Sequence, residues 1–157
     1  MLQLRSKETL DHGDRGWLKA RHHFLVSGDG NPANGALGAL VVWNDDEIAP
    51  GTGFGRHSHA DMEIVTYVRQ GAVTHEDSAG NVGRTVAGDV QVMSAGTGIS
   101  HSEHNRDEDA LKLFQIWLLP RHAAGHHAGT AANSPRGIAQ DALSSWRVEI
   151  RGMPRPS

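Results

Sequence analysis

Short runs of apolar or alternating residues, separated by glycine-rich turns, make up most of the chain before Pro120. Four of these runs are ALGALVVWN (36–44), EIVTYVRQG (63–71), GDVQVMSAG (88–96) and LKLFQIWLL (111–119). They are rich in the residues that favour strands, and HEDSAGNVG (75–83) collects the turn formers of a hairpin loop. No stretch before Pro120 keeps a helical period over three turns. The pattern therefore predicts an all-β sandwich or barrel.

The chain changes character after Pro120, at the end of the last of these runs. Residues 1–120 carry 10 Lys and Arg against 16 Asp and Glu, whereas residues 121–157 carry 5 Arg against 2 acidic residues. In this second segment only IAQDALSSWRVEI (138–150) offers apolar residues to bury. We expect one domain over 1–120 and an atypical Ala/Arg/His-rich tail over 121–157, poorly ordered at its start.

The composition narrows the classes of function. A chain of 157 residues has the length of one domain with a real core. It contains no cysteine, so any metal would be held by nitrogen and oxygen ligands, for which 11 histidines are available. The formal net charge of −3 argues against direct nucleic-acid binding. The N-terminus lacks the apolar run of a signal peptide and no run is long enough to cross a membrane, so we expect a cytoplasmic protein.

Two histidines spaced two residues apart form the first candidate site. His57 and His59 lie in GFGRHSHADME (53–63), and residues two apart on a strand point to the same side. This pair alone is as consistent with two surface residues as with a site. Glu63 is two strand steps from His59, so the spacing makes it a further ligand or a partner of a ligand.

A second pair follows in GISHSEHN (98–105). His101 and Glu103 share a strand face by the same spacing, with Asn105 on that face again. Short polar patterns recur by chance, but two such pairs, each preceded by glycines, are much harder to obtain by chance. On facing strands the two pairs would bring three imidazoles and one carboxylate to a point. That set is a plausible ligand shell for a divalent transition metal.

The remaining histidines are weaker candidates. His22 and His23 could line a pocket or simply pack. His104 is expected to point to the face opposite His101 and not to bind metal. His126 and His127 are adjacent in the tail and cannot share a strand face, so we assign them no function.

These motifs resemble the N-terminal cupin domain of the pirin family, especially bacterial pirin-like proteins with quercetin dioxygenase activity. The resemblance rests on GFGRHSHADMEIVTYVRQGAVTHEDSAGN and GDVQVMSAGTGISHSEHN, and it extends to HGDRGWLKARHHF and LFQIWLLP. It covers roughly residues 10–120. It implies an all-β cupin barrel, the double-stranded β-helix or jelly roll, here as a single barrel with the tail attached.

Pirins usually have two cupin domains, and here the family pattern stops where the second would begin. We expect the tail to be the product of a truncation or frameshift. The alternative is a natural one-cupin variant whose tail packs on the exposed barrel. Loss of the second barrel would leave apolar surface uncovered, which favours self-association into a homo-oligomer.

The resemblance also implies a ligand set. His57, His59, His101 and Glu103 match the family's metal ligands, and the metal would most often be Fe(II), with Mn, Co, Ni, Cu or Zn also accepted. Glu63 matches a position that is not normally a ligand, so we expect it beside the ligands rather than among them. Glu103 would also be the catalytic base that accepts a substrate proton.

Two functions of different kinds follow from this resemblance. One is a metal-dependent dioxygenase that opens the heterocyclic ring of flavonols such as quercetin with O₂. The other is a regulatory protein that binds a transcription regulator or a metabolic enzyme without turnover. Both need the same four ligands, so the sequence leaves both open. A degraded copy that binds metal and does little is a third interpretation.

Overall fold

The computed structural model describes residues 4–122 and the backbone of residues 128–134. These residues form one short 3₁₀ helix, η1, and eleven strands. Their bounds are η1 Lys7–Thr9, β1 Asp11–Asp14, β2 Leu18–His22, β3 Leu40–Ile48, β4 Gly53–His59, β5 Glu63–Gln70, β6 Ala72–Asp77, β7 Val82–Val86, β8 Val90–Gly96, β9 Ile99–His104, β10 Leu111–Leu118 and β11 Ala128–Ser134. The predicted apolar runs correspond to β3, β5, β8 and β10, which confirms the all-β class.

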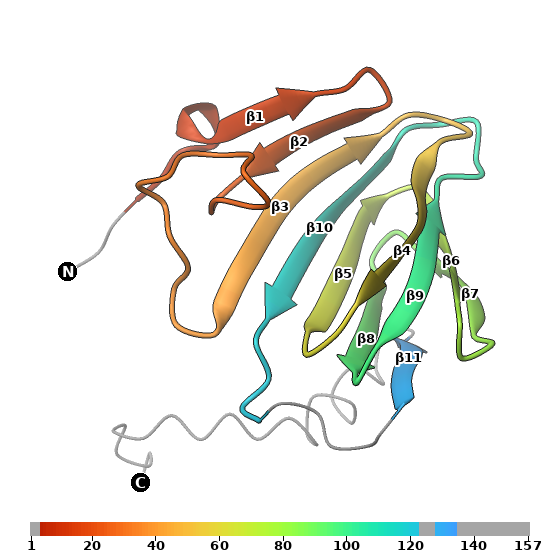
Figure 1. Cartoon of the computed structure of the whole chain (residues 1–157). Coiled ribbons are helices and arrows are strands. Elements are labelled where there is room, and N and C mark those ends of the chain that lie inside the picture. The colour runs from red at the N-terminus through yellow and green to blue at the C-terminus, as the bar shows by residue number, and fades with distance from the viewer. Residues whose placement is uncertain (1–3, 123–127, 135–157) are drawn as a thin grey trace, which may run out of the picture.

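The strands form two antiparallel sheets that face each other (Figure 1). The larger sheet has the order β1-β2-β3-β10-β5-β8-β11, and the smaller has the order β4-β9-β6-β7. Consecutive strands often change sheet: β3 and β5 belong to the larger sheet, while β4 between them belongs to the smaller one. This exchange places residues that are close in sequence on opposite walls of the barrel.

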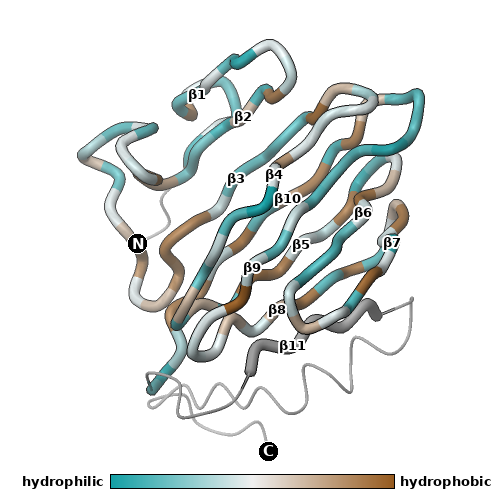
Figure 2. Tube along the Cα trace, turned by 45° about the vertical axis from the view of Figure 1, so that its right-hand side comes forward, coloured by the Kyte–Doolittle hydropathy of each residue, from teal (hydrophilic) through white to brown (hydrophobic). Residues whose placement is uncertain are grey.

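Alternation along the strands builds the apolar core. In β10, Leu111 and Leu113 are fully buried, while Lys112 and Phe114, which alternate with them, are only partly buried. One cluster gathers Leu18, Ala20, Ile48, Val68, Val73, Leu111 and Leu113, and a second gathers Ile64, Met93, Ala95 and Ile99. Burial of each large side chain contributes about 1.5–3 kcal/mol before entropy is counted. In Figure 2, hydrophobic (brown) and hydrophilic (teal) segments alternate along strands of the larger sheet.

The interior also holds polar side chains. Thr66, His75, Gln91, His101, Glu103 and Gln115 are all buried on the inner faces of the two sheets. A buried polar group is costly unless it finds a partner, so such residues are expected to form a connected network. This network lies between the two apolar clusters and surrounds the candidate site.

The predicted hairpin is present, but its loop is shorter than the sequence suggested. His75, Glu76 and Asp77 belong to β6, and the chain turns only after them before β7 begins at Val82. The Asp77 carboxylate accepts hydrogen bonds from the backbone N–H groups of Ala79 and Asn81, both at 2.9 Å. This aspartate therefore ends the strand and stabilises the turn at the same time.

Part of the segment after Pro120 adds a strand to the barrel. β11 pairs antiparallel with β8 at the edge of the larger sheet, from Ala128 opposite Gly96 to Ser134 opposite Val90. His126, His127 and the apolar segment 138–150 lie outside the described residues. No helix in the described part of the chain is long and apolar enough to span a membrane.

Candidate metal centre

The pairing of β4 with β9 brings the two sequence motifs together. His57 lies directly opposite His101 in the register of these strands, and His59 lies opposite Ile99. The strands approach closely at Gly53, where an added β carbon would overlap the backbone carbonyl of Glu103. Only glycine leaves room for this contact, so the glycine before the histidines serves the approach of the two strands.

Three imidazoles converge at this point. The ligand atoms of His57, His59 and His101 all lie within 4.8 Å of one another, and Nε2 of His57 lies 3.1 Å from Nε2 of His101. The ring centroids are 4.4–5.0 Å apart. Trp117 packs edge-on against His59, with centroids 4.9 Å apart, and holds that ring from the side of the larger sheet. Three imidazoles at such distances form a ligand set suited to Zn, Cu, Fe or Ni.

The hydrogen-bond partners indicate which nitrogens are free to bind a cation. Nδ1 of His57 lies 2.8 Å from the Gly55 carbonyl oxygen, which can only accept, so this Nδ1 carries the hydrogen and Nε2 keeps a lone pair. Nε2 of His59 is buried and has no hydrogen-bond partner. A buried nitrogen without a partner costs free energy unless another group satisfies it. A metal ion at the three-histidine cluster would do so, and the residues therefore fit a metal.

Burial keeps two of these imidazoles neutral. Desolvation, with smaller effects from neighbouring histidines, lowers the pKa of His101 to about 3 and that of His59 to about 4. Both rings are therefore uncharged at neutral pH, as a metal ligand must be. The metal would not have to displace a proton from either ring.

Glu103 lies beside this cluster and is held by three donors. Its Oε1 accepts hydrogen bonds from the Gln91 amide at 3.0 Å and the Thr66 hydroxyl at 3.4 Å, and its Oε2 accepts one from the Gln115 amide at 2.5 Å. Burial nevertheless raises the pKa of Glu103 above its ordinary value. Its carboxylate lies within 4.8 Å of ligand atoms of His75 and His101, in a second group that shares His101 with the first. The structure thus joins the three predicted histidines in one cluster and places Glu103 next to it.

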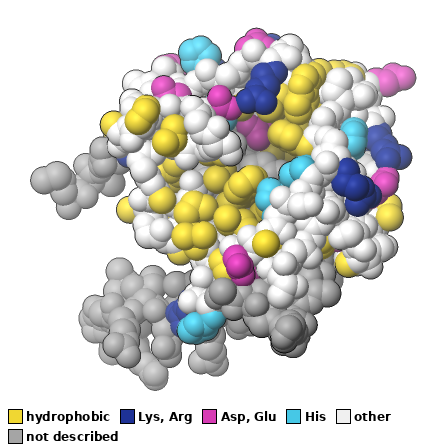
Figure 3. Space-filling view, viewed as in Figure 1, with side chains coloured by type: hydrophobic (Ala, Val, Ile, Leu, Met, Phe, Trp, Pro, Cys, Tyr) yellow, Lys and Arg dark blue, Asp and Glu magenta, His cyan; other side chains and the backbone are white. Residues whose placement is uncertain are grey.

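A pocket of about 280 Å³ opens onto these residues. His57, His59, His101 and Glu103 all line it, together with the apolar side chains of Phe54 and Trp117. Histidine and hydrophobic side chains meet on the same face in Figure 3. The pocket therefore brings a ligand next to the histidine cluster, against an apolar wall.

Asp46 from β3 lines the same pocket, although it is only 2% exposed. Its Oδ1 has no hydrogen-bond partner in the structure. Desolvation, with the nearby charges of Asp45 and Glu103, raises the pKa of Asp46 to about 7. Asp46 was not predicted, because an acidic pair in a strand does not reveal which of its two side chains turns inward.

One predicted site residue lies elsewhere. Glu63 begins β5 in the larger sheet, across a turn at Asp61 from His59 in the smaller one, and it accepts a hydrogen bond from the Ser94 hydroxyl. The prediction of a shared face with His59 is wrong, because the chain leaves one sheet and enters the other between them. In the described residues Glu63 belongs to neither group of potential metal ligands.

The other polar residues considered in the sequence lie outside the three-histidine cluster. Asn105 is fully buried and donates to the carbonyls of Ile48 and Asp109, so it links the end of β3 to the loop before β10. His22 lines the pocket, and its Nδ1 lies 3.1 Å from Oδ1 of Asn44. His23 packs on Trp43, and burial lowers its pKa. His104 alternates with Glu103 away from the interior, as predicted.

Besides Asp46, five interior residues beside the site were not predicted: Thr66, His75, Asp77, Gln91 and Gln115. His75 and Asp77 show the same spacing of two as the recognised pairs, and this signal could have found them. It was overlooked because the turn formers after Asp77 made the whole segment look like a loop. Gln91 and Gln115 leave no local signal, since their roles depend on strands that pair over long distances.

Comparison with known proteins identifies the family. The family model of pirin matches residues 3–118. This chain belongs to the pirin family. A pirin-like protein from Caulobacter vibrioides is 53% identical over 137 residues, which cover 87% of this chain and 59% of that protein. The predicted membership is confirmed, and the facing sheets are those of a cupin barrel.

Two further pirin relatives bear on the chemistry. Quercetin 2,3-dioxygenase from Escherichia coli K12 is 47% identical over 121 residues, covering 76% of this chain and 52% of that enzyme. The crystal structure of the bacterial pirin YhhW from Escherichia coli, in complex with nickel(II), matches with a TM-score of 0.80 and 41% identity, covering 85% of this chain and 58% of that one. The chain thus spans little more than half the length of each of these three relatives.

Proposed function

We propose that this pirin-family chain is a metal-dependent dioxygenase of the quercetinase type, acting on flavonols or closely related enols. The observation that carries the proposal is the three-histidine cluster at a pocket, with the unpartnered Nε2 of His59 in it. The relative named quercetin 2,3-dioxygenase supports the choice of reaction. The reaction consumes one O₂, opens the heterocyclic ring and releases carbon monoxide.

The three histidines would hold the metal, and Glu103 would join them as the fourth ligand. We propose a divalent transition metal, with Fe(II) as the first choice. When bound, it would polarise an enolic oxygen of the substrate as a Lewis acid. The Glu103 carboxylate lies within 4.8 Å of ligand atoms of His75 and His101, beside the three-histidine cluster.

The pocket walls suit a flat aromatic ligand. Phe54 and Trp117 flank the histidines, and each contacts one of their rings at centroid distances of 6.3 and 4.9 Å. Aromatic walls bind planar rings through stacked or edge-on contacts. The pocket volume of about 280 Å³ is close to the lower end of small-molecule sites, which begin near ~300 Å³. A compact planar enol therefore fits better than a large or flexible molecule.

Glu103 is the group we assign to proton transfer. It lines the pocket, and burial makes it more basic than an exposed carboxylate, so it can accept the hydroxyl proton of an enol. Its amide and hydroxyl donors keep the carboxylate in one place. Gln91, Gln115 and Thr66 are thus the residues that hold the base.

Oxygen consumption and carbon monoxide release with quercetin test the proposal. The metal-loaded chain should show both, and His101→Ala should lose both because one of three converging imidazoles is gone. His104→Ala is the matched control, since it removes a histidine from the same strand on the opposite face. It should retain the activity of the unaltered chain.

Two outcomes would count against the proposal. Equal activity in the metal-loaded chain and in His101→Ala would show that the cluster does not carry the reaction. One bound metal per chain without oxygen consumption by any flavonol would favour the regulatory alternative. Recovery of a stable protein partner in a pull-down would then support that alternative.

A further inference from the structure

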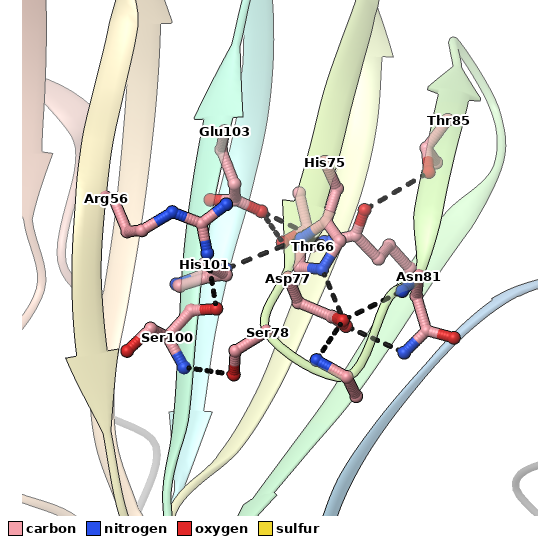
Figure 4. Close-up of polar contacts among 12 residues, drawn as sticks. Arg56, Thr66, His75, Asp77, Ser78, Asn81, Thr85, Ser100, His101 and Glu103 are labelled. Atoms are coloured by element: carbon pink, nitrogen blue, oxygen red, sulfur yellow. Dashed lines mark hydrogen bonds and ion pairs between the residues drawn. The ribbon is translucent and has the colours of Figure 1, made fainter.

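A second pair of polar residues faces the candidate metal ligands from β6. In the register of β6 and β9, His75 is the direct partner of Glu103, and Asp77 is the direct partner of His101. His75 is 2% exposed and Asp77 is 7% exposed, so both are interior residues. Figure 4 shows them beside His101 and Glu103. Because they are two residues apart on one strand, both side chains point to the site.

The carboxylate of Asp77 is held in place by several hydrogen bonds, one of them from His75. Its two oxygens accept hydrogen bonds from the Ala79 and Asn81 N–H groups, from the Asn81 amide at 2.8 Å and from Nε2 of His75 at 3.3 Å. Burial raises the pKa of Asp77, but the hydrogen bonds from Asn81, His75 and Ala79 lower it below its ordinary value. A carboxylate can only accept, so Nε2 of His75 carries the hydrogen.

This assignment determines what the other nitrogen of His75 does. In the neutral ring, Nδ1 of His75 is an acceptor, and the Gln91 amide donates to it at 3.2 Å. Nδ1 of His101 also lies 3.4 Å from Nδ1 of His75, as a long hydrogen bond. Nδ1 of His75 has one lone pair, so the Gln91 amide and Nδ1 of His101 share it as donors. As a donor, His101 carries its hydrogen on Nδ1, which leaves its lone pair on Nε2. That Nε2 is the atom that faces His57 at 3.1 Å.

We propose that His75, anchored by Asp77, is a positioning residue that holds His101 in the tautomer and orientation required for binding metal through Nε2. It would not touch the metal itself. Ligand histidines generally need an acceptor for their second ring nitrogen, and loss of such a partner weakens metal binding about 10–100-fold. Here the acceptor is another histidine rather than a carboxylate or a backbone carbonyl. The inference rests on the proposed metal site.

Cobalt(II) titration of the metal-free, full-length chain tests the assignment. The dissociation constant and the visible absorption of bound Co(II) are measured for the unaltered chain and its variants. His75→Leu should bind Co(II) about 10–100-fold more weakly and change the absorption bands, since the His101 ring loses its acceptor. His75→Asn should recover most of both properties, because its Oδ1 can accept where Nδ1 of His75 did.

Val73→Ala is the matched control for packing. Val73 lies on the same strand, is fully buried and belongs to the apolar core, so its truncation lowers stability without touching the hydrogen-bonded chain. Its Co(II) affinity and spectrum should remain those of the unaltered chain. Equally weak binding in Val73→Ala and His75→Leu would show that only packing matters, and the proposal would be wrong.

Co(II) binding also distinguishes the positioning role of His75 from the existence of the metal site. If the unaltered chain binds one Co(II), and His57→Ala abolishes it, the site stands. Unchanged affinity and spectrum in both His75 variants would then overturn the positioning role alone. Absence of Co(II) binding in the unaltered chain would overturn the metal site and the positioning role together.

Discussion

Nε2 of His57 lies 3.1 Å from Nε2 of His101, across the pairing of β4 and β9. Each ring has a partner for its other nitrogen, which is the Gly55 carbonyl for His57 and Nδ1 of His75 for His101. With the hydrogens on both Nδ1 atoms, the two Nε2 lone pairs face each other. Two facing lone pairs repel unless a cation lies between them. The cluster is therefore arranged to be stabilised by a metal.

Replacing His59 should separate the effect of the metal from that of the fold. In the metal-free protein, His59→Leu should raise the free energy of unfolding by about 1 kcal/mol, since it removes the buried Nε2 that has no partner. With Co(II) at 100 times its dissociation constant, the unaltered chain should gain about 2.7 kcal/mol and the variant much less. Urea unfolding with and without metal measures both effects. Equal stabilisation by metal would show that His59 is not a ligand.

The donors around Glu103 give a second prediction. Gln115→Leu should lower the free energy of unfolding by about 1–3 kcal/mol, because Oε2 of Glu103 loses its donor at 2.5 Å and Nε1 of Trp117 loses its acceptor at 3.3 Å. Gln70→Leu is the control, since Gln70 is exposed and donates only to the Ala110 carbonyl. Its effect should stay within about 0.5 kcal/mol. Similar losses in both variants would show that Glu103 does not depend on Gln115.

Gly53 provides a steric test of the approach of β4 to β9. Gly53→Ala should destabilise the protein by about 1–3 kcal/mol and weaken Co(II) binding, because the new methyl group overlaps the Glu103 backbone and separates the strands. Gly55→Ala is the matched control on the same strand, since an added β carbon there meets no atom within 4 Å. Thermal unfolding and Co(II) titration measure both. If Gly53→Ala kept full affinity, the site would tolerate a wider strand spacing.

The two-residue spacing of a strand was enough to predict part of the candidate site. His57, His59 and His101 come together as expected, because the two pairs with a spacing of two lie on adjacent, paired strands, and Glu103 lies beside them. The role of the four residues as metal ligands stays a prediction. Glu63 was misplaced because local periodicity does not show that the chain changes sheet near Asp61.

Residues contributed by distant strands could not be predicted in the same way. Gln91 and Gln115 reach Glu103 only through the order of strands in the larger sheet. That order depends on burial summed over the whole barrel, and no short motif encodes it. The spacing of His75 and Asp77 is visible in the sequence. However, the turn formers after Asp77 make their strand look like part of a loop.

Asp46 should make the metal-free protein less stable as pH rises. The ordinary pKa of Asp46 is 3.8, and burial raises it to about 7 in the folded chain. The charges of Asp45 and Glu103 also raise this pKa, while the charge of Arg69 lowers it. Between these values the folded chain keeps a proton that the unfolded chain has lost. Stability therefore falls as pH rises through this window, and above about pH 7 the penalty is complete. At ~1.36 kcal/mol per pKa unit, the full penalty is about 4 kcal/mol.

Asp46→Asn removes this titration while keeping the shape of the side chain. Between pH 5 and pH 8, the unaltered chain should lose about 3 kcal/mol more of its free energy of unfolding than the variant does. His59 and His101 have lowered pKa values and change stability in the opposite direction below about pH 6.5, but they are common to both proteins. Urea unfolding at the two pH values, on metal-free protein, isolates the Asp46 contribution. Parallel pH profiles would mean that Asp46 is already ionised at pH 5 and that its buried Oδ1 is solvated by water.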